Sequence, residues 1–173
     1  MRDIFRRFER IVRNAHRFSD APARREEQHP FEVRDIHPAL PHTVRQLFDD
    51  SHYAQATFEA FKFLDKEVKR HAGVDKTGKS LMMEAFREIS PLIQLTPLSN
   101  ETERNEQEGY KFIFAGAVIA IRNPRGHEYD IEDDVGTCLD HLSLVSHLLR
   151  RLEKAGYKPR RPSVRPRRAK QLA

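Results

Sequence analysis

Apolar residues recur at three- and four-residue steps through nearly every patterned segment of this 173-residue chain, and this spacing is typical of amphipathic helices. The steps predict helices over residues 2–17, 42–49, 52–71, 79–89, 102–122 and 131–154. No segment shows the convincing alternation of a half-buried strand. The sequence therefore predicts an all-α fold, an antiparallel helical bundle with short links.

The helix expected over residues 102–122 differs from the others in its second half, "YKFIFAGAVIAI", which is apolar on all sides. Such a helix is normally buried, so we expect it at the centre of the bundle. Pro124 cannot continue a helix and restricts the residue before it. We therefore expect the central helix to end at Arg122, with a tight corner before the next helix begins near Asp130 or Ile131.

Basic residues are concentrated at the two ends of the chain. Residues 1–18 hold six Arg and two acids, the last sixteen residues hold seven Lys or Arg and no acid, and the stretch between them holds 18 basic and 24 acidic residues. This distribution predicts an N-terminal amphipathic helix and connector over 1–36, a helical domain over 37–157, and a disordered basic tail over 158–173. We expect the N-terminal helix to dock on the bundle or on a partner, a membrane surface being the alternative.

The basic tail has two open interpretations. It could bind RNA or DNA weakly through phosphate neutralisation, or it could only keep the chain soluble. The candidate contacts for weak nucleic-acid binding are Arg125, Arg160, Arg161, Arg165, Arg167 and Arg168.

Several classes of protein are disfavoured by composition. A single cysteine, Cys138, excludes an intramolecular disulfide and indicates a reducing setting. The longest apolar run is ten residues, well below the roughly 20 that a membrane helix needs. No apolar stretch of a signal peptide follows Met1. We therefore expect a cytoplasmic protein with no membrane partner.

The stretch "GVDKTGKS", residues 73–80, fits the phosphate-loop pattern of nucleotide-hydrolysing enzymes. A phosphate loop lies between a buried strand and a helix, whereas a predicted helix precedes this one. We therefore interpret the stretch as a turn between two helices, in which Gly73 ends the first helix and Gly78 serves the turn.

The stretch "HEYDIEDD", residues 127–134, offers four possible metal ligands: His127, Asp130, Asp133 and Asp134. Acidic residues at the start of a helix are also ordinary capping groups, and we favour this interpretation. We expect neither a bound metal nor another cofactor.

Arg122 and His127 are the best candidates for chemistry. They flank the predicted corner, so both side chains could reach one phosphate. Arg binds phosphate oxygens through a permanent charge, and His transfers protons near neutral pH. The plainer alternative is that Arg122 caps its helix and His127 bonds to a backbone carbonyl.

This arrangement resembles the signature of the HEPN superfamily, which is Arg, four to six residues, then His. Here the signature is Arg122, "NPRG" and His127, with the polar Asn123 directly after the Arg. The surrounding stretches "HYAQATFEAFKFLDKEVKRHAG", "KSLMMEAF", "NEQEGYKFIFAGAVIAIRNPRGHE" and "LDHLSLVSHLLRRLEKAG" resemble the Ymh branch of prokaryotic and phage-borne HEPN proteins. The resemblance covers roughly residues 37–157.

The resemblance implies a homodimer in which Arg and His of two protomers line one cleft. It implies metal-independent RNA cleavage that leaves a 2′,3′-cyclic phosphate and a 5′-OH, with Arg122 and His127 catalytic and Asn123 supporting. The implied role is a toxin, or abortive-infection defence against phage. Some HEPN proteins only bind nucleotides or RNA, so a binding module or a subunit of a larger assembly remains the alternative.

Tyr129 adds one further expectation. Arg122, His127 and Tyr129 together resemble a toxin subgroup in which a partner nucleotidyltransferase silences the toxin by modifying the tyrosine. The other interpretation of Tyr129 is packing alone. An antitoxin or a nucleotidyltransferase is therefore a possible partner, besides RNA.

Overall fold

The computed structural model describes residues 28–128 and 130–160, and the chain divides into two units, Met1–Val33 and Arg34–Ala173. The described part of the first unit contains the short helix α2 (Pro30–Val33). The helix predicted over residues 2–17 and most of the predicted basic tail lie outside the described residues.

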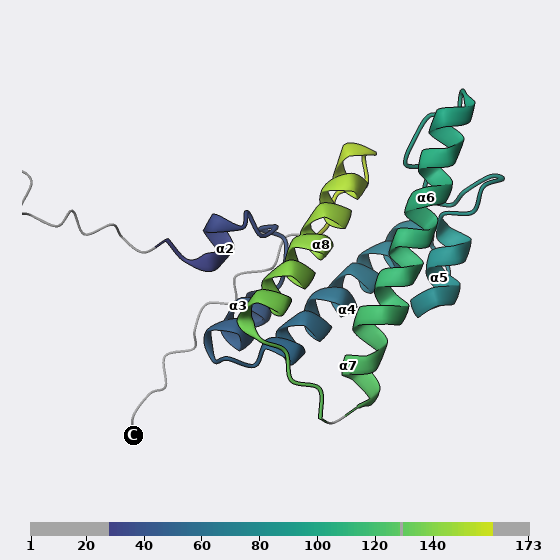
Figure 1. Ribbon diagram of the computed structural model, residues 1–173. Coiled ribbons are helices and arrows are strands. Elements are labelled where there is room, and N and C mark those ends of the chain that lie inside the picture. The colour runs from purple at the N-terminus through teal and green to yellow at the C-terminus, as the bar shows by residue number, and fades with distance from the viewer. Residues whose placement is uncertain (1–27, 129, 161–173) are drawn as a thin grey trace, which may run out of the picture. The chain divides into compact units, whose positions relative to one another are not determined.

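The second unit is built from helices alone (Figure 1). Its elements are α3 (His42–Asp49), α4 (Tyr53–Ala72), α5 (Gly78–Ala85), α6 (Glu101–Ala117), the π-helix η1 (Val118–Arg122), α7 (Asn123–His127) and α8 (Val135–Lys154). No strand occurs in residues 28–128 or 130–160, so the predicted all-α class is confirmed. In the same ranges, no helix has both the length and the apolar character required to cross a bilayer.

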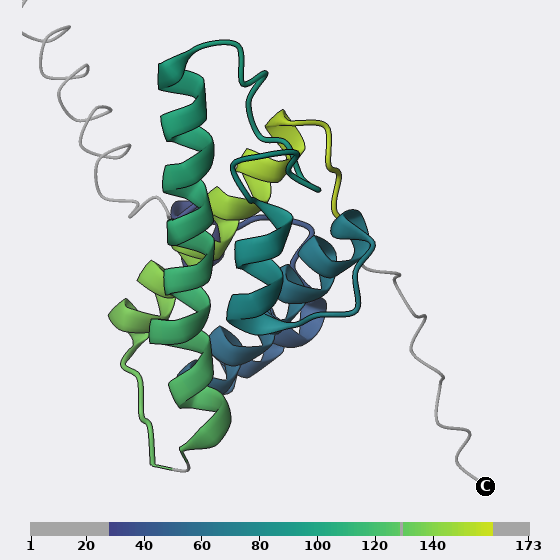
Figure 2. The ribbon, with the colours of Figure 1, turned by 90° about the vertical axis from the view of Figure 1, so that its right-hand side faces the viewer.

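Helix α4 lies at the centre of the second unit and packs against α3, α5, α7, α8 and η1. Its N-terminal part meets that of α8, where Thr57 Oγ1 lies 3.6 Å from Cys138 Sγ. Its C-terminal end meets the residues that follow α8, so α4 and α8 run in the same direction. Helix α6 runs the opposite way, as Figures 1 and 2 show. The bundle is therefore mixed in direction rather than antiparallel throughout.

The core fills the space around α4 with large apolar side chains. Those fully removed from solvent include Phe61, Leu64, Leu81, Met82, Phe86, Ile93, Phe114, Leu142, Leu148 and Leu149. The rings of Phe86 and Phe114 stack with centroids 4.3 Å apart and join α5 to α6. Each such side chain stabilises the fold by about 1.5–3 kcal/mol relative to its exposed state.

The prediction that the second half of the long helix is buried on all sides is wrong. One face of α6 and η1 is open to solvent: Phe112 is 55% exposed, Ile113 44% and Ile119 43%, and Gly116 and Ala120 are also exposed. The opposite face carries the buried Phe114, Ala117 and Val118 and packs on α4 and α5. We call the five exposed residues the α6 stripe.

The prediction that Pro124 ends the helix is also wrong. A proline inside an α-helix removes one N–H and its ring collides with the carbonyl four residues earlier. Here the helix widens into η1 just before the proline, and the Asn123 N–H bonds to the carbonyl of Val118, five residues back. Pro124 then lies in the first turn of α7, where helices tolerate proline. The helix therefore continues to His127 without a corner.

The other helix ends differ less from their predictions. Helix α5 ends at Ala85 rather than at residue 89, and Ile89, the last residue of the predicted helix, is 85% exposed. Helix α8 begins at Val135 rather than near Asp130 or Ile131, because Asp134 caps it by accepting a 2.8 Å hydrogen bond from the Thr137 N–H. The capping interpretation of this acidic residue is thus confirmed.

The stretch "GVDKTGKS" is the predicted turn between helices. Gly73 ends α4 in the left-handed conformation, at φ +68°, and Gly78 begins α5 at φ +61°. The Gly78 N–H donates to the buried carboxylate of Asp65 over 2.8 Å. A side chain of the protein therefore occupies the helix start where a phosphate loop would hold phosphate.

Candidate functional site

Arg122 is the last residue of the π-helix η1, and π-helical turns are frequent at functional sites. Its guanidinium carbon lies 5.5 Å from the centroid of the Phe58 ring on α4. The Nη1 atom donates to Asn123 Oδ1 over 3.1 Å, whereas the buried Nε has no hydrogen-bond partner. No carboxylate lies within ion-pair distance of it among residues 28–128 and 130–160, so its charge is held in place but not neutralised.

His127 is the last residue of α7 and is exposed. Within the described part of the chain its side chain makes no hydrogen bond or ion pair. Because Asn123–His127 is α-helical and Arg122 before it has right-handed helical dihedral angles, the two residues project about 140° apart around the helix axis. One protomer therefore does not bring the predicted pair into contact.

Asn123 contacts Arg122 directly, as the hydrogen bond to its side-chain oxygen shows. This contact joins two consecutive residues at the junction between η1 and α7. The amide orients the guanidinium without neutralising it.

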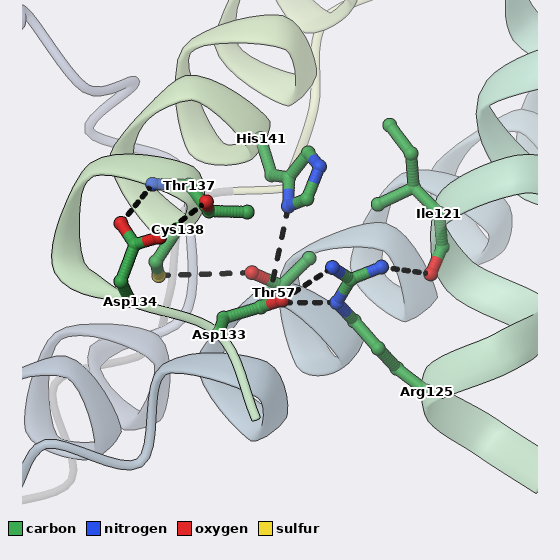
Figure 3. Close-up of polar contacts among 8 residues, drawn as sticks. All are labelled: Thr57, Ile121, Arg125, Asp133, Asp134, Thr137, Cys138 and His141. Atoms are coloured by element: carbon green, nitrogen blue, oxygen red, sulfur yellow. Dashed lines mark hydrogen bonds and ion pairs between the residues drawn. The ribbon is translucent and has the colours of Figure 1, made fainter. Parts of the chain in front are cut away.

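Arg125 points inward, away from the position that a nucleic-acid contact would require. Its Nε donates to Asp133 Oδ2 over 2.7 Å, its Nη2 donates to Asp133 Oδ1, and its Nη1 donates to the Ile121 carbonyl over 2.8 Å (Figure 3). The side chains of Arg125 and Asp133 are only 9% and 4% exposed. This buried pair fastens the segment before α8 to η1 and α7.

His141 lies above the pair on α8, with its Nδ1 3.9 Å from Asp133 Oδ2 (Figure 3). That nitrogen is buried and makes no hydrogen bond. Burial, and then the positive charge of Arg125, lower the pKa of His141, against the opposing pull of Asp133 and Asp140. The neutral imidazole is therefore the favoured form beside the pair.

The possible metal ligands of "HEYDIEDD" do not converge. Asp133 is taken by Arg125 and Asp134 by the cap of α8, and no group of three potential metal-ligating side chains forms within residues 28–128 and 130–160. Cys138 is fully buried, and burial raises the pKa of its thiol to about 11. It is therefore a core residue of α8 rather than a reactive thiol.

The first residues of the predicted basic tail are fixed to the end of α4. Arg70 Nη2 donates to the Lys158 carbonyl over 2.8 Å, and the Arg160 N–H donates to the buried Glu67 carboxylate over 3.0 Å. The other tail arginines, Arg161, Arg165, Arg167 and Arg168, lie outside the described residues, and so does Tyr129. Arg160 lies at the opposite end of α4 from Phe58, which contacts Arg122.

The sequence did not single out Phe58, which Arg122 contacts, or Asp133 as the partner of Arg125. Phe58 lies on the apolar face of the helix predicted over residues 52–71, and nothing in its spacing connects it with Gly126. Yet a Cβ atom at Gly126 would lie 2.7 Å from Phe58 Cε2, so the ring and α7 touch where only glycine fits. Gly126 beside the Arg and His signature was the one available signal of a close approach.

A family model described as "Protein of unknown function (Hypoth_ymh)" matches residues 34–152. Neither the curated proteins nor the solved structures contain a significant match to the chain. The matched range begins where the second unit begins and contains the whole candidate site.

Proposed function

The chain belongs to the Hypoth_ymh family, and we propose that this member is a metal-independent endoribonuclease in which Arg122 and His127 carry the reaction. The observation that supports this most directly is the state of Arg122. Its cation is held at a π-helical turn, without a carboxylate partner among the described residues and with one buried N–H unused. An exposed imidazole follows on the same helix. The HEPN resemblance of this segment agrees with the proposal.

The chemistry requires a proton acceptor and a positive charge at one phosphodiester. The 2′-oxygen attacks the phosphorus as its proton leaves, the bond to the 5′-oxygen breaks, and that oxygen takes up a proton. His127 serves in the proton transfers, and Arg122 stabilises the additional negative charge on the phosphoryl oxygens. The products are a 2′,3′-cyclic phosphate and a 5′-OH. Asn123 supports the reaction by orienting the Arg122 guanidinium.

We further propose that the active form is a homodimer. Arg122 and His127 of one protomer project to different sides of the helix, so a second copy would complete the site. The α6 stripe runs along the helix that leads into this site and carries exposed Phe112, Ile113 and Ile119 around the small residues Gly116 and Ala120. Small residues at that spacing let two helices approach closely, and a twofold contact would bury both copies of the stripe.

The biological role that fits this activity is a cytoplasmic toxin or a phage-defence ribonuclease. An antitoxin or a modifying nucleotidyltransferase would then keep it inactive. Expression of the wild-type chain should be poorly tolerated, and His127→Ala should relieve that effect. If both forms are equally benign, the site is better understood as a binding site for a nucleotide or an RNA end.

The first experiment is RNA cleavage by the purified chain in excess EDTA, with the product ends examined for a cyclic phosphate. Arg122→Ala and His127→Ala should each lower the rate by about 100-fold or more, because each removes a group used in the transition state. Arg104→Ala and His52→Ala remove an exposed guanidinium and an exposed imidazole elsewhere and should leave the rate unchanged. Equal cleavage by all variants, or none by any, contradicts the proposal.

Mixing the two inactive variants tests the composite site. If each site takes Arg122 from one protomer and His127 from the other, exchange between the variants rebuilds one intact site in each mixed dimer. About a quarter of the wild-type activity should then return, since half of the dimers are mixed and each has one of two sites intact. If both residues act within one protomer, mixing restores nothing.

A further inference from the structure

The ring of Phe58 is shared by two cations. Arg122 Cζ lies 5.5 Å from its centroid, and Lys62 Nζ, one turn further along α4, lies 5.7 Å from the same centroid. Gly126 closes against the edge of the ring. Phe58 thus joins the candidate site on η1 and α7 to the flank of the central helix α4.

The positive charge continues along α4 beyond Lys62. Lys66 is four residues further on and therefore on the same helix face, and it is exposed. It has no ion-pair partner within residues 28–128 and 130–160. Lys62 is 40% exposed and pairs with Glu59 over 2.8 Å. An exposed pair of this kind contributes about 0–1 kcal/mol, so a phosphate competes with Glu59 easily.

We propose that Lys62 and Lys66 form a binding surface for the phosphate backbone of single-stranded RNA, beside Arg122. We call these two residues the α4 lysines. The inference rests on the proposed function, because it takes Arg122 to contact the phosphate that is cleaved. A chain of cations one helical turn apart beside an aromatic ring is a common arrangement for single strands, whose phosphates attract Lys and Arg regardless of sequence. The α4 lysines hold the strand that flanks the cleaved bond and do not take part in the chemistry.

Binding is measured on the full chain carrying His127→Ala, so that the RNA stays intact if the proposed function is correct. The probe is a fluorescein-labelled 12-nucleotide single-stranded RNA, followed by anisotropy in EDTA at several salt concentrations. Lys62→Gln and Lys66→Gln are added singly to this parent. Lys154→Gln is the matched control, since it removes an exposed lysine from the far end of the 20-residue α8.

Each α4 variant should lower the slope of log affinity against log salt by about 0.7, the contribution of one phosphate contact on a single strand. At 0.1 M salt the same contribution corresponds to about a fivefold weaker affinity. Lys154→Gln should change neither quantity. Since these side chains are at the surface, circular dichroism should show folded protein in every case.

The proposal is overturned if the α4 variants bind like their parent, if Lys154→Gln weakens binding as much, or if the parent does not bind the RNA. The two proposals fail separately. If wild type does not cleave RNA but the α4 variants bind it more weakly, the nuclease assignment fails and the surface stands. If wild type cleaves and the α4 variants bind normally, the nuclease assignment stands and the surface fails.

Discussion

At the scale of single residues, the candidate site depends on a glycine. Gly126 lies on α7 directly against Phe58, and the same ring contacts Arg122. The side chain that would be added at this position points at the ring edge rather than at solvent. The identity of residue 126 therefore sets how closely α7 approaches α4.

Gly126→Ala should destabilise the protein by about 1–3 kcal/mol, because the new Cβ would lie 2.7 Å from Phe58 Cε2, so the ring or α7 would have to shift. Urea denaturation measures the change. Gly109→Ala is the control: it is also a helical glycine, but nothing lies within 4 Å of its added Cβ, so it should stabilise α6 by about 1 kcal/mol. If both variants gain stability, the contact with Phe58 does not restrict residue 126.

A second residue-scale prediction concerns pH. Burial and Arg125 lower the pKa of His141 below its ordinary value of 6.5. Between the lower pKa of His141 in the folded protein and its ordinary value of 6.5, the unfolded chain carries one more proton than the folded chain. The stability that neutral His141 provides is therefore present above about pH 6.5, and it is lost as the pH falls towards the folded pKa. His141→Gln should reduce the difference in unfolding free energy between pH 7 and pH 5. An equal difference in both proteins contradicts this.

At the scale of elements, the main feature is a helix that continues through a proline. The π turn η1 absorbs the missing N–H of Pro124, and Arg125 bonds to the carbonyl of Ile121 inside that turn. Asp133 then ties Arg125 to the segment before α8. The positions of Arg122 and His127 thus depend on the π-helical turn η1. The buried ion pair between Arg125 and Asp133, a residue outside this helix, helps to fix that turn.

Removing one partner of this pair should be costly. Asp133→Asn leaves the Arg125 cation buried without its counter-charge and should lower the unfolding free energy by about 3 kcal/mol or more. Asp140→Asn is the matched control, because its pair with Arg34 is exposed and should contribute about 0–1 kcal/mol. Similar losses of unfolding free energy in the two variants would mean that the buried pair stabilises the fold no more than the exposed pair does.

At the scale of the whole molecule, the α6 stripe is an exposed apolar surface. Three large apolar side chains exposed by more than 40% each on one helix face form a patch of the kind that marks protein interfaces. The proposed homodimer would cover it and would also bring the Arg122 and His127 of two copies towards one cleft.

Ile113→Glu should therefore convert a dimer into a monomer, since it places a charge in the middle of the stripe. Sedimentation equilibrium measures the mass. Ile89→Glu, at an 85% exposed residue outside the stripe, is the control and should leave the mass unchanged. A wild-type chain that is monomeric at all concentrations rules out this interface.

The sequence alone determined the helical class and the positions of most helices, because local apolar periodicity is a property of neighbouring residues. It also determined that "GVDKTGKS" is a turn, since the segment before it is helical and a phosphate loop requires a strand. The same local information assigned the acidic residues of "HEYDIEDD" to the start of a helix and singled out Arg122 and His127 as candidates.

The tertiary structure decided what depends on contacts between distant segments. An apolar helix face has the same sequence pattern whether or not a neighbouring helix covers it. Only the packing of α6 on α5 and of η1 on α4 and α5 showed which face stays exposed. The presence of Pro124 predicts a break in the helix unless the backbone widens before it. In the fold the π-helical turn η1 provides this widening, and Arg125 bonds to both the Ile121 carbonyl and Asp133. Arg122 is far along the chain from Phe58 and Lys62, and only the fold places its guanidinium over the same ring that Lys62 contacts.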